Sequence, residues 1–375
     1  MSNPVKILVI GATGYLGGII VDRLLTHPQA SRFAITAFAR SDEKAKKIEA
    51  AGLGLKATSG DLSALTEATA KSDVVFNVAS SDNLPLVQAI LDGAKKHFAA
   101  TKVPVVLIHT SGSAIVADQA MGEYASDKVY DDSDSAYLDA IPVQQWHRNV
   151  DIPIAAAHNE GEFVASDVSL PKVLIDFGML QGYIKAYVTA PPMIWGLATG
   201  KLVDAGLQNP VQTGLLVIGR FSVLRGQYGR FGPQKNLWST IEVHDLADLH
   251  VALFNQAVLE GKKIAGGSAY YFSANGDVAT ADWAPLVAKA LHKYGALKSA
   301  EITPFSAEEL KKWPVLGAFS VNSRCSDSRS RSLGWKPRPD KTGKEYLQSI
   351  DENIKLMVQQ PNDFGASWGS FQLPA

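Results

Sequence analysis

Three glycines near the start of the chain have the spacing of a phosphate-binding turn. Gly11, Gly14 and Gly17 occur in the segment GATGYLG, after an apolar run and before an amphipathic stretch. The turn would therefore join a strand to a helix. A pyrophosphate can approach the backbone N–H groups at such a helix start only where no Cβ blocks it. We predict a dinucleotide cradle formed by Gly11, Thr13, Gly14, Tyr15, Leu16 and Gly17.

The end of the second predicted strand favours one dinucleotide over the other. An acidic residue there would bind the adenosine ribose and repel a 2′-phosphate, but this chain has Arg40, followed by Lys44. A guanidinium can bind a phosphate through two hydrogen bonds, and a lysine adds a second charge. We therefore predict that NADP(H) is preferred. NAD(H) is the alternative, because Asp42 is close enough in sequence to reach a ribose.

Small and polar residues follow the next two predicted strands. Asp61 and Leu62 come after the third strand, where a short polar side chain and the next amide can bind the adenine edge. Ala79 and Ser80 come after the fourth, where small residues leave room for the middle of the cofactor. Ligands of open α/β sheets bind at the carboxyl ends of the strands, so these four residues are predicted to contact the dinucleotide.

Short apolar runs alternate with helical patterns from residue 5 to about residue 110. This alternation predicts a Rossmann-type α/β fold, a doubly wound parallel sheet with a smaller C-terminal substrate-side subdomain. The dinucleotide-binding domain would span 1–196, with an insertion at about 159–183, and the second part, 197–375, would be interleaved with it. A helix opened by Asp245 and a capping box at Ser306 are expected in the second part.

Six motifs together resemble a known family: GATGYLGG, GDL, HTSGS, PPMIWG, VHDLADLH and LGWKP. The chain resembles the extended and atypical short-chain dehydrogenase/reductases, in the epimerase/dehydratase-like and fungal NmrA-like group. The resemblance implies a parallel sheet that binds NAD(P) at its edge and a C-terminal subdomain that closes over the substrate. It also implies that Pro191, Met193 and Ile194 lie near the nicotinamide ring.

The resemblance implies a catalytic serine, tyrosine and lysine, with the lysine four residues after the tyrosine. Ser111, Tyr124 and Lys128 match this pattern. Two alternatives could supply the substrate hydroxyl in place of Ser111: Thr110, which we also assign to the cofactor site, and Ser113. A tyrosine can exchange a proton near neutral pH only beside a cation. The segment around Tyr124 nevertheless has the composition of an acidic loop. Where extended members place the tyrosine and lysine, this chain has His147 and Asp151, which form a second candidate pair.

Composition excludes several classes of protein. The 36 basic and 37 acidic residues give a net charge of −1, so we expect no nucleic-acid partner. The one cysteine, Cys325, cannot form an internal disulfide, and the spacing of His244 and His250 does not suit a metal, so no metal site is predicted. The absence of a long apolar stretch or a leader pattern predicts a cytoplasmic protein without a membrane partner. A homodimer is compatible with the sequence.

These observations lead to three hypotheses about function. The first is an NADPH-dependent oxidoreductase that reduces a carbonyl or related unsaturated group of a small, largely apolar metabolite. Six aromatic residues suggest an apolar substrate pocket: Trp146, Tyr183, Tyr187, Trp195, Phe221 and Trp238. The second hypothesis is a non-catalytic NmrA-like protein that senses NADP(H). The third is a sugar-nucleotide epimerase or dehydratase.

Overall fold

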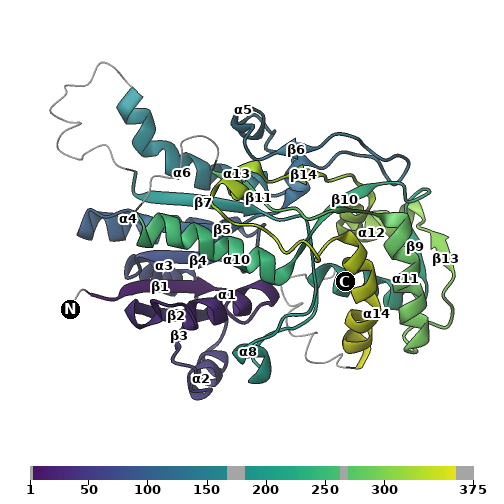
Figure 1. Ribbon diagram of the computed structural model, residues 1–375, viewed down its shortest axis with the longest axis horizontal. Helices are drawn as coiled ribbons and strands as arrows, with labels where there is room; N and C mark the ends of the chain where they lie inside the picture. The colour runs from purple at the N-terminus through teal and green to yellow at the C-terminus, as the bar shows by residue number, and fades with distance from the viewer. Residues whose placement is uncertain (1–2, 167–181, 262–268, 360–375) are drawn as a thin grey trace.

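The computed structural model describes residues 3–166, 182–261 and 269–359 and is built around a parallel sheet of seven strands (Figure 1). The strands lie in the order β11-β7-β5-β4-β1-β2-β3. Their bounds are β1 Val5–Ile10, β2 Phe33–Ala39, β3 Lys56–Ser59, β4 Val74–Asn77, β5 Val105–Thr110, β7 Ile184–Ala190 and β11 Tyr270–Phe272. This order confirms the predicted Rossmann-type fold, in which the strand order reverses between β1 and β4.

Helices cover both faces of the sheet because side chains alternate along each strand. In β1, Ile7 and Val9 enter one hydrophobic cluster, and Leu8 and Ile10 enter the other. The first cluster includes residues of α1 Tyr15–Leu25, α2 Asp42–Ala50 and α10 Val243–Phe254. The second includes residues of α3 Leu62–Ala70, α4 Leu84–Thr101 and α6 Arg148–Ser166. The two faces are therefore buried to a similar extent, as a parallel sheet requires.

A third hydrophobic cluster forms the smaller part of the molecule, to the right in Figure 1. It is built around Trp283, whose side chain is fully buried. Its helices are α9 Thr213–Arg225, α11 Thr280–Lys293, α12 Ala307–Lys312 and α14 Gly343–Gln359. Its small sheets pair β8 Met193–Trp195, β10 Leu237–Glu242 and β12 Asp277–Ala279, and separately β9 Tyr228–Arg230 and β13 Ile302–Pro304.

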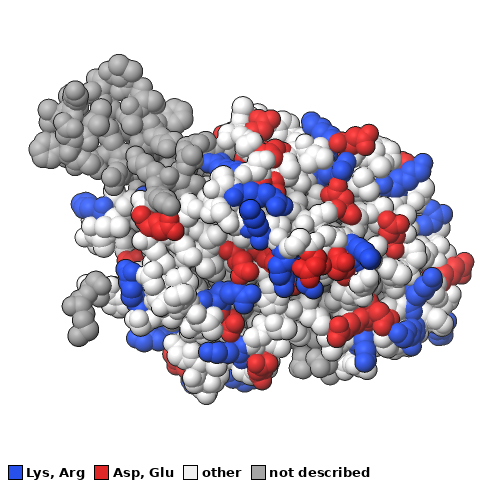
Figure 2. Space-filling model, viewed as in Figure 1, with Lys and Arg blue, Asp and Glu red and all other residues white. Residues whose placement is uncertain are grey.

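Short elements complete the described chain. A two-stranded sheet pairs β6 Tyr130–Asp131 with β14 Cys325–Ser326. The short α-helices are α5 Ser135–Asp139, α8 Lys201–Asp204 and α13 Ser328–Ser332. Segments of 3₁₀-helix are η1 Ala30–Arg32, η2 Ser113–Val116 and η4 Pro314–Ser320, and η3 Asn255–Leu259 is a π-helical segment. Acidic and basic side chains are interspersed on the face shown in Figure 2.

The structure confirms some local predictions and corrects others. Ser306 forms the predicted capping box with Glu309. The helix predicted to open at Asp245 is capped instead by Glu242, which accepts from the backbone N–H groups of His244 and Asp245. Most of the predicted 159–183 insertion lies outside the described residues. The division at residue 196 stays a prediction, although β11, from beyond it, pairs with β7.

Candidate active site

The glycine turn lies where the strand order reverses, at the carboxyl ends of β1 and β4. Gly11 has a φ of +89°, and a Cβ there would lie 2.9 Å from the backbone of Ala79. A Cβ on Gly17 would lie 2.1 Å from the carbonyl oxygen of Gly11. The turn can therefore be this tight only with glycine at both positions.

The first turn of α1 is open to an anion. Its N-cap is Gly14, and no side chain caps it within the described chain. The phenol of Tyr15 points away from this end of the helix and donates to the carbonyl of Gly196 at 2.6 Å. Leu16 is buried, and the carbonyl of Thr13 accepts from Asn209. A helix start with free N–H groups and no obstructing Cβ fits the pyrophosphate of a dinucleotide.

Two cations gather after β2. Burial and then the charge of Arg40 lower the pKa of Lys44 from its ordinary value, so the two side chains are close enough to repel each other. Neither forms an ion pair with a residue that the structure describes. The carboxylate of Asp42 is engaged by the hydroxyl of Ser59 on β3. An anion such as a phosphate would relieve the repulsion between Arg40 and Lys44.

The residues predicted after β3 and β4 lie at the same edge of the sheet. Asp61 caps α3, because its carboxylate accepts from Ala64 N–H at 2.9 Å. Leu62 is 45% exposed. Ala79 is exposed beside Gly11, and the Ser80 hydroxyl accepts from the backbone N–H of Asp82 at 3.3 Å.

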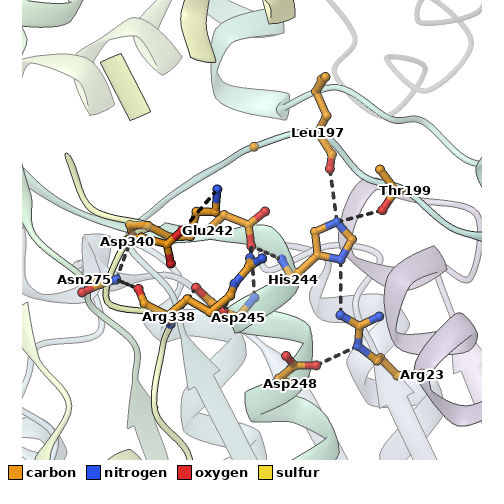
Figure 3. A network of polar contacts seen from close by, with 12 residues as sticks. Arg23, Leu197, Thr199, Glu242, His244, Asp245, Asp248, Asn275, Arg338 and Asp340 are labelled. Carbon is orange, nitrogen blue, oxygen red and sulfur yellow. Dashed lines mark hydrogen bonds and ion pairs between the residues drawn. The ribbon is translucent and has the colours of Figure 1, made fainter. Parts of the chain in front are cut away.

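The loop after β8 is fixed to α1 and α10 by polar contacts (Figure 3). The imidazole Nε2 of His244 lies 3.2 Å from the carbonyl of Leu197 and 3.3 Å from the hydroxyl of Thr199, and Nδ1 lies 3.4 Å from Arg23. Before this loop, Pro191 is buried and Met193 and Ile194 are half-buried. These contacts hold the segment in place beside the glycine turn.

A second set of contacts in Figure 3 neutralises two nearly buried carboxylates. The guanidinium of Arg338 binds Asp245 at 2.7 Å and also Glu242. Burial raises the pKa of Glu242, although the charges of His244 and Arg338 oppose the effect. Arg338 therefore joins the C-terminal part to the start of α10.

Ser111 follows β5 and faces α6. Its hydroxyl donates to the carboxylate of Asp151 at 2.7 Å, and the phenol of Tyr270 donates to the same oxygen at 3.0 Å. Burial raises the pKa of Asp151 to about 6, against the hydrogen bonds from Ser111 and Tyr270. The preceding residue, Thr110, faces the other side of the sheet, where its hydroxyl lies 2.8 Å from Nε2 of His250.

The structure does not bring Tyr124 and Lys128 together. The segment between them has no regular secondary structure, and Tyr124 is 48% exposed. Desolvation and the neighbouring Asp118 raise the pKa of Tyr124, whereas an acid that acts at neutral pH needs it lowered. The Lys128 ammonium lies 4.4 Å from the ring centre of Tyr130. The predicted triad is therefore without geometric support.

His147 lies near Ser111 instead, immediately before α6. Its Nδ1 is 2.7 Å from a carboxylate oxygen of Asp82, not of Asp151. A Cβ on Gly112 would lie 2.8 Å from its Nε2. Reasoning from the sequence missed Asp82, although a carboxylate shortly after the fourth strand was a usable signal.

The predicted aromatic pocket is not a single cluster. Tyr183, Tyr187 and Trp195 are buried in three separate hydrophobic cores, and Phe221 shares the core of Trp195. Trp146 is 38% exposed and precedes His147.

Comparisons with known proteins concern the fold and the dinucleotide-binding part of the chain. Residues 11–137 match the model of an NAD(P)H-binding family. A curated relative from Acremonium sp, named oxidase ucsJ, is 26% identical, covering 88% of this chain and 92% of the relative. Together with the glycine turn, the match identifies a dinucleotide-binding Rossmann protein.

Solved structures share the fold along nearly the whole chain. UDP-glucose 4-epimerase from Thermotoga maritima is 14% identical with a TM-score of 0.54, covering 96% of this chain and 99% of that one. Yeast methylglyoxal/isovaleraldehyde reductase, complexed with NADPH, is 16% identical with a TM-score of 0.50, covering 95% and 99%. These structures share the Rossmann-type fold of this chain, as the sequence predicts.

The described residues contain neither a membrane-spanning helix nor a metal-ligating cluster. None of the described helices is long and apolar enough to cross a membrane. Within residues 3–166, 182–261 and 269–359, no group of three or more metal-ligating side chains is found.

Proposed function

We propose that the protein is an NADPH-dependent oxidoreductase that reduces a carbonyl or related unsaturated group of a small, largely apolar metabolite. The observation that carries the proposal is the open start of α1 beside the glycine turn, with Arg40 and Lys44 unpaired among the described residues one strand away. The name of the Acremonium relative, an oxidase, also supports hydride transfer. The same residues would serve oxidation of an alcohol, the reverse reaction.

When bound, the reduced nicotinamide supplies a hydride. The helix start would hold the pyrophosphate, and Arg40 and Lys44 would hold the 2′-phosphate. The hydroxyl of Ser59 donates to the Asp42 carboxylate, so Asp42 is less available to bind the adenosine ribose of NADH. This favours NADPH over NADH.

The proposal is tested by titrating intrinsic tryptophan fluorescence with NADPH and NADH. We expect Arg40→Ala to weaken NADPH binding about tenfold and NADH binding little, because only NADPH carries the 2′-phosphate. Lys46→Ala, an exposed cation on the same helix, is the matched control. An equal loss for both dinucleotides would contradict the assignment of Arg40. Failure to bind either dinucleotide would overturn the proposed function.

A sensor without catalysis is the second candidate, because Tyr124 and Lys128 are held by different partners. Incubation with NADPH and a panel of aldehydes, ketones and enones separates the two candidates. Consumption of NADPH with any panel member supports the enzyme, and tight binding without consumption supports the sensor.

An epimerase that binds a sugar nucleotide ranks third. Of the arginines that could hold a second diphosphate, Arg225 is paired with Glu309 at 2.6 Å, and Arg230 donates to the carbonyl of Gly232. These contacts engage both side chains within the C-terminal part.

A further inference from the structure

His147 joins the ends of the two strands that meet at the edge of the predicted cofactor site. Its Nδ1 contacts Asp82, five residues after β4, and its Nε2 lies over Gly112, two residues after β5. The His147 side chain is 13% exposed. Its φ of +64° is unusual for a residue other than glycine, so the surrounding contacts hold this backbone in a conformation that costs energy.

The contact with Asp82 determines which nitrogen of His147 can exchange a proton. The carboxylate of Asp82 accepts from Nδ1, and this leaves Nε2 as the exchanging atom. Nε2 has no hydrogen bond to any residue in the described parts of the chain. Burial of Asp82 opposes ionisation, but the hydrogen bond and charge of His147 lower the pKa of Asp82 below its ordinary value. Asp82 is therefore ionised and keeps the imidazole in one orientation.

Two other titratable groups lie near the imidazole, and each is hydrogen-bonded through one atom to a neighbouring side chain. His109 on β5 lies 2.9 Å through Nδ1 from the amide of Asn77, and burial lowers the pKa of His109 to about 3, so it stays neutral. Asp151 on α6 accepts from Ser111. The Ser111 proton thus points towards the helix and not towards a substrate oxygen. His147 differs from both, because its Nε2 has no partner among the described residues and an imidazole can exchange a proton through that atom.

We propose that His147, oriented by Asp82, is the proton donor of the reaction, in place of the tyrosine and lysine of the family pattern. This inference rests on the proposed function. As the carbonyl carbon accepts the hydride, the π electron pair of the C=O bond moves to the oxygen. Nε2 of the imidazolium gives its proton to that oxygen, which becomes a hydroxyl. His147 is then neutral, with its remaining proton on Nδ1 beside Asp82, and solvent restores the imidazolium.

The first test follows the ring protons of His147 by NMR over a pH series, with the signal assigned by its loss in His147→Gln. Oxidised nicotinamide carries a positive charge and reduced nicotinamide does not. We therefore expect half-protonation of His147 at a pH about half a unit lower with NADP⁺ than with NADPH. His292, on α11 in the third core, is the control and should titrate alike in both complexes.

Each outcome of this test has a defined meaning. Fluorescence on the same sample first shows whether the dinucleotides bind, and failure there overturns the proposed function together with this inference. Binding of both dinucleotides with the same His147 titration would overturn this inference alone. A difference confined to His147 supports it.

Two variants test the positioning of the imidazole without removing it. Gly112→Ala places a methyl group 2.8 Å from Nε2, so we expect the difference between the NADP⁺ and NADPH titrations to disappear. Asp82→Asn removes the carboxylate that holds Nδ1, so we expect the difference between the NADP⁺ and NADPH titrations to become smaller. Unchanged titrations in both variants would contradict the proposed contacts.

Turnover provides an independent readout with any panel substrate that the wild type reduces. We expect His147→Gln to lower kcat by about 10²-fold or more, the usual contribution of a general acid, with little change in the NADPH Kd. His292→Gln is the matched control. Loss of turnover in Tyr124→Phe together with full activity in His147→Gln would overturn the inference.

Discussion

At the scale of single residues, burial decides which side chains of the site carry charge. Asp151 and His109 are both fully buried, and each is driven towards its neutral form, the first by a raised pKa and the second by a lowered one. Asp82 is more exposed and keeps its charge beside His147. The sequence alone gives no measure of this burial, and it gave no sign that the hydroxyl of Ser111, the predicted catalytic serine, donates to Asp151.

Asp151 makes stability depend on pH. Its pKa is raised to about 6, so the folded protein binds the proton more tightly than the unfolded chain does. The contribution of Asp151 to the free energy of unfolding therefore falls by at most about 3 kcal/mol as the pH rises from about 4 to about 6. Asparagine does not ionise, so Asp151→Asn should not lose this stability as the pH rises. Urea denaturation should therefore show the variant gaining stability relative to wild type between about pH 4 and about pH 6. Asp139→Asn, at an exposed site, is the control, and a difference that does not vary with pH would contradict the assignment.

At the scale of elements, the site depends on how closely α1 and α10 approach the strands. Gly17 lets α1 pack against the turn that precedes it, and Tyr15 then reaches the loop after β8. The start of α10 is capped by Glu242 and neutralised by Arg338. The positions of α1 and α10 therefore both depend on contacts between segments that are far apart in the chain.

Gly17→Ala should separate α1 from the glycine turn. The added Cβ would lie 2.1 Å from the Gly11 carbonyl oxygen, which is backbone and cannot rotate away. We expect a loss of about 2–3 kcal/mol in unfolding free energy, as for overpacked cores, and much weaker NADPH binding. Gly317→Ala, where a Cβ meets open space, is the control. Denaturant titration measures the free energy of unfolding, and fluorescence titration measures NADPH binding. If both values equal those of the wild type, the role of the glycine turn is contradicted.

Arg338→Ala should destabilise the junction between α10 and the C-terminal part. It leaves Glu242 and Asp245, whose side chains are 7% and 3% exposed, without their cation. Because the guanidinium itself is partly exposed, we expect a loss of about 2 kcal/mol, below the usual cost for a fully buried pair. Lys341→Ala, which removes a weak pair with Asp340 at 3.9 Å, should cost less than about 0.5 kcal/mol. Equal losses in thermal melts of the two variants would contradict this difference.

At the scale of the whole molecule, the two predicted parts share one sheet and one core. β11 comes from beyond residue 196 and forms the outer strand beside β7. α10 packs against α1, and the indole of Trp335 donates to the backbone carbonyl of Asp245 at 2.8 Å. The Rossmann part therefore depends on the C-terminal part for one strand and one helix.

A chain that ends at residue 196 should fail to fold cooperatively. Removal of α10 and β11 exposes the buried faces of α1 and β7, which include Ile20 and Val188. We expect a broad thermal transition by circular dichroism and no saturable NADPH binding. The full chain, measured in parallel, should melt in a sharp transition. A sharp transition with intact NADPH binding in the shortened chain would show that 1–196 is an autonomous domain.

Local sequence patterns predicted the first six strands of the central sheet, the glycine turn and a dinucleotide cofactor, because each depends on residues that are close in the chain, but they did not predict β11. The apolar run before GATGYLG defines β1 and the start of α1, and the structure confirms both. Arg40 and Lys44 are only four residues apart, so the sequence was enough to predict that they lie close together.

Only the tertiary structure decided the arrangement of the candidate acid. Tyr124 and Lys128 match a spacing that works on a helix, but that segment is not helical, and its Tyr124 carbonyl accepts a hydrogen bond from Asn322, nearly 200 residues away. His147 and Asp82 are 65 residues apart and meet because β4 and β5 end side by side. Spacing along the chain predicts contacts within one element, whereas contacts between elements follow from the order of strands in the sheet, which local pattern does not encode.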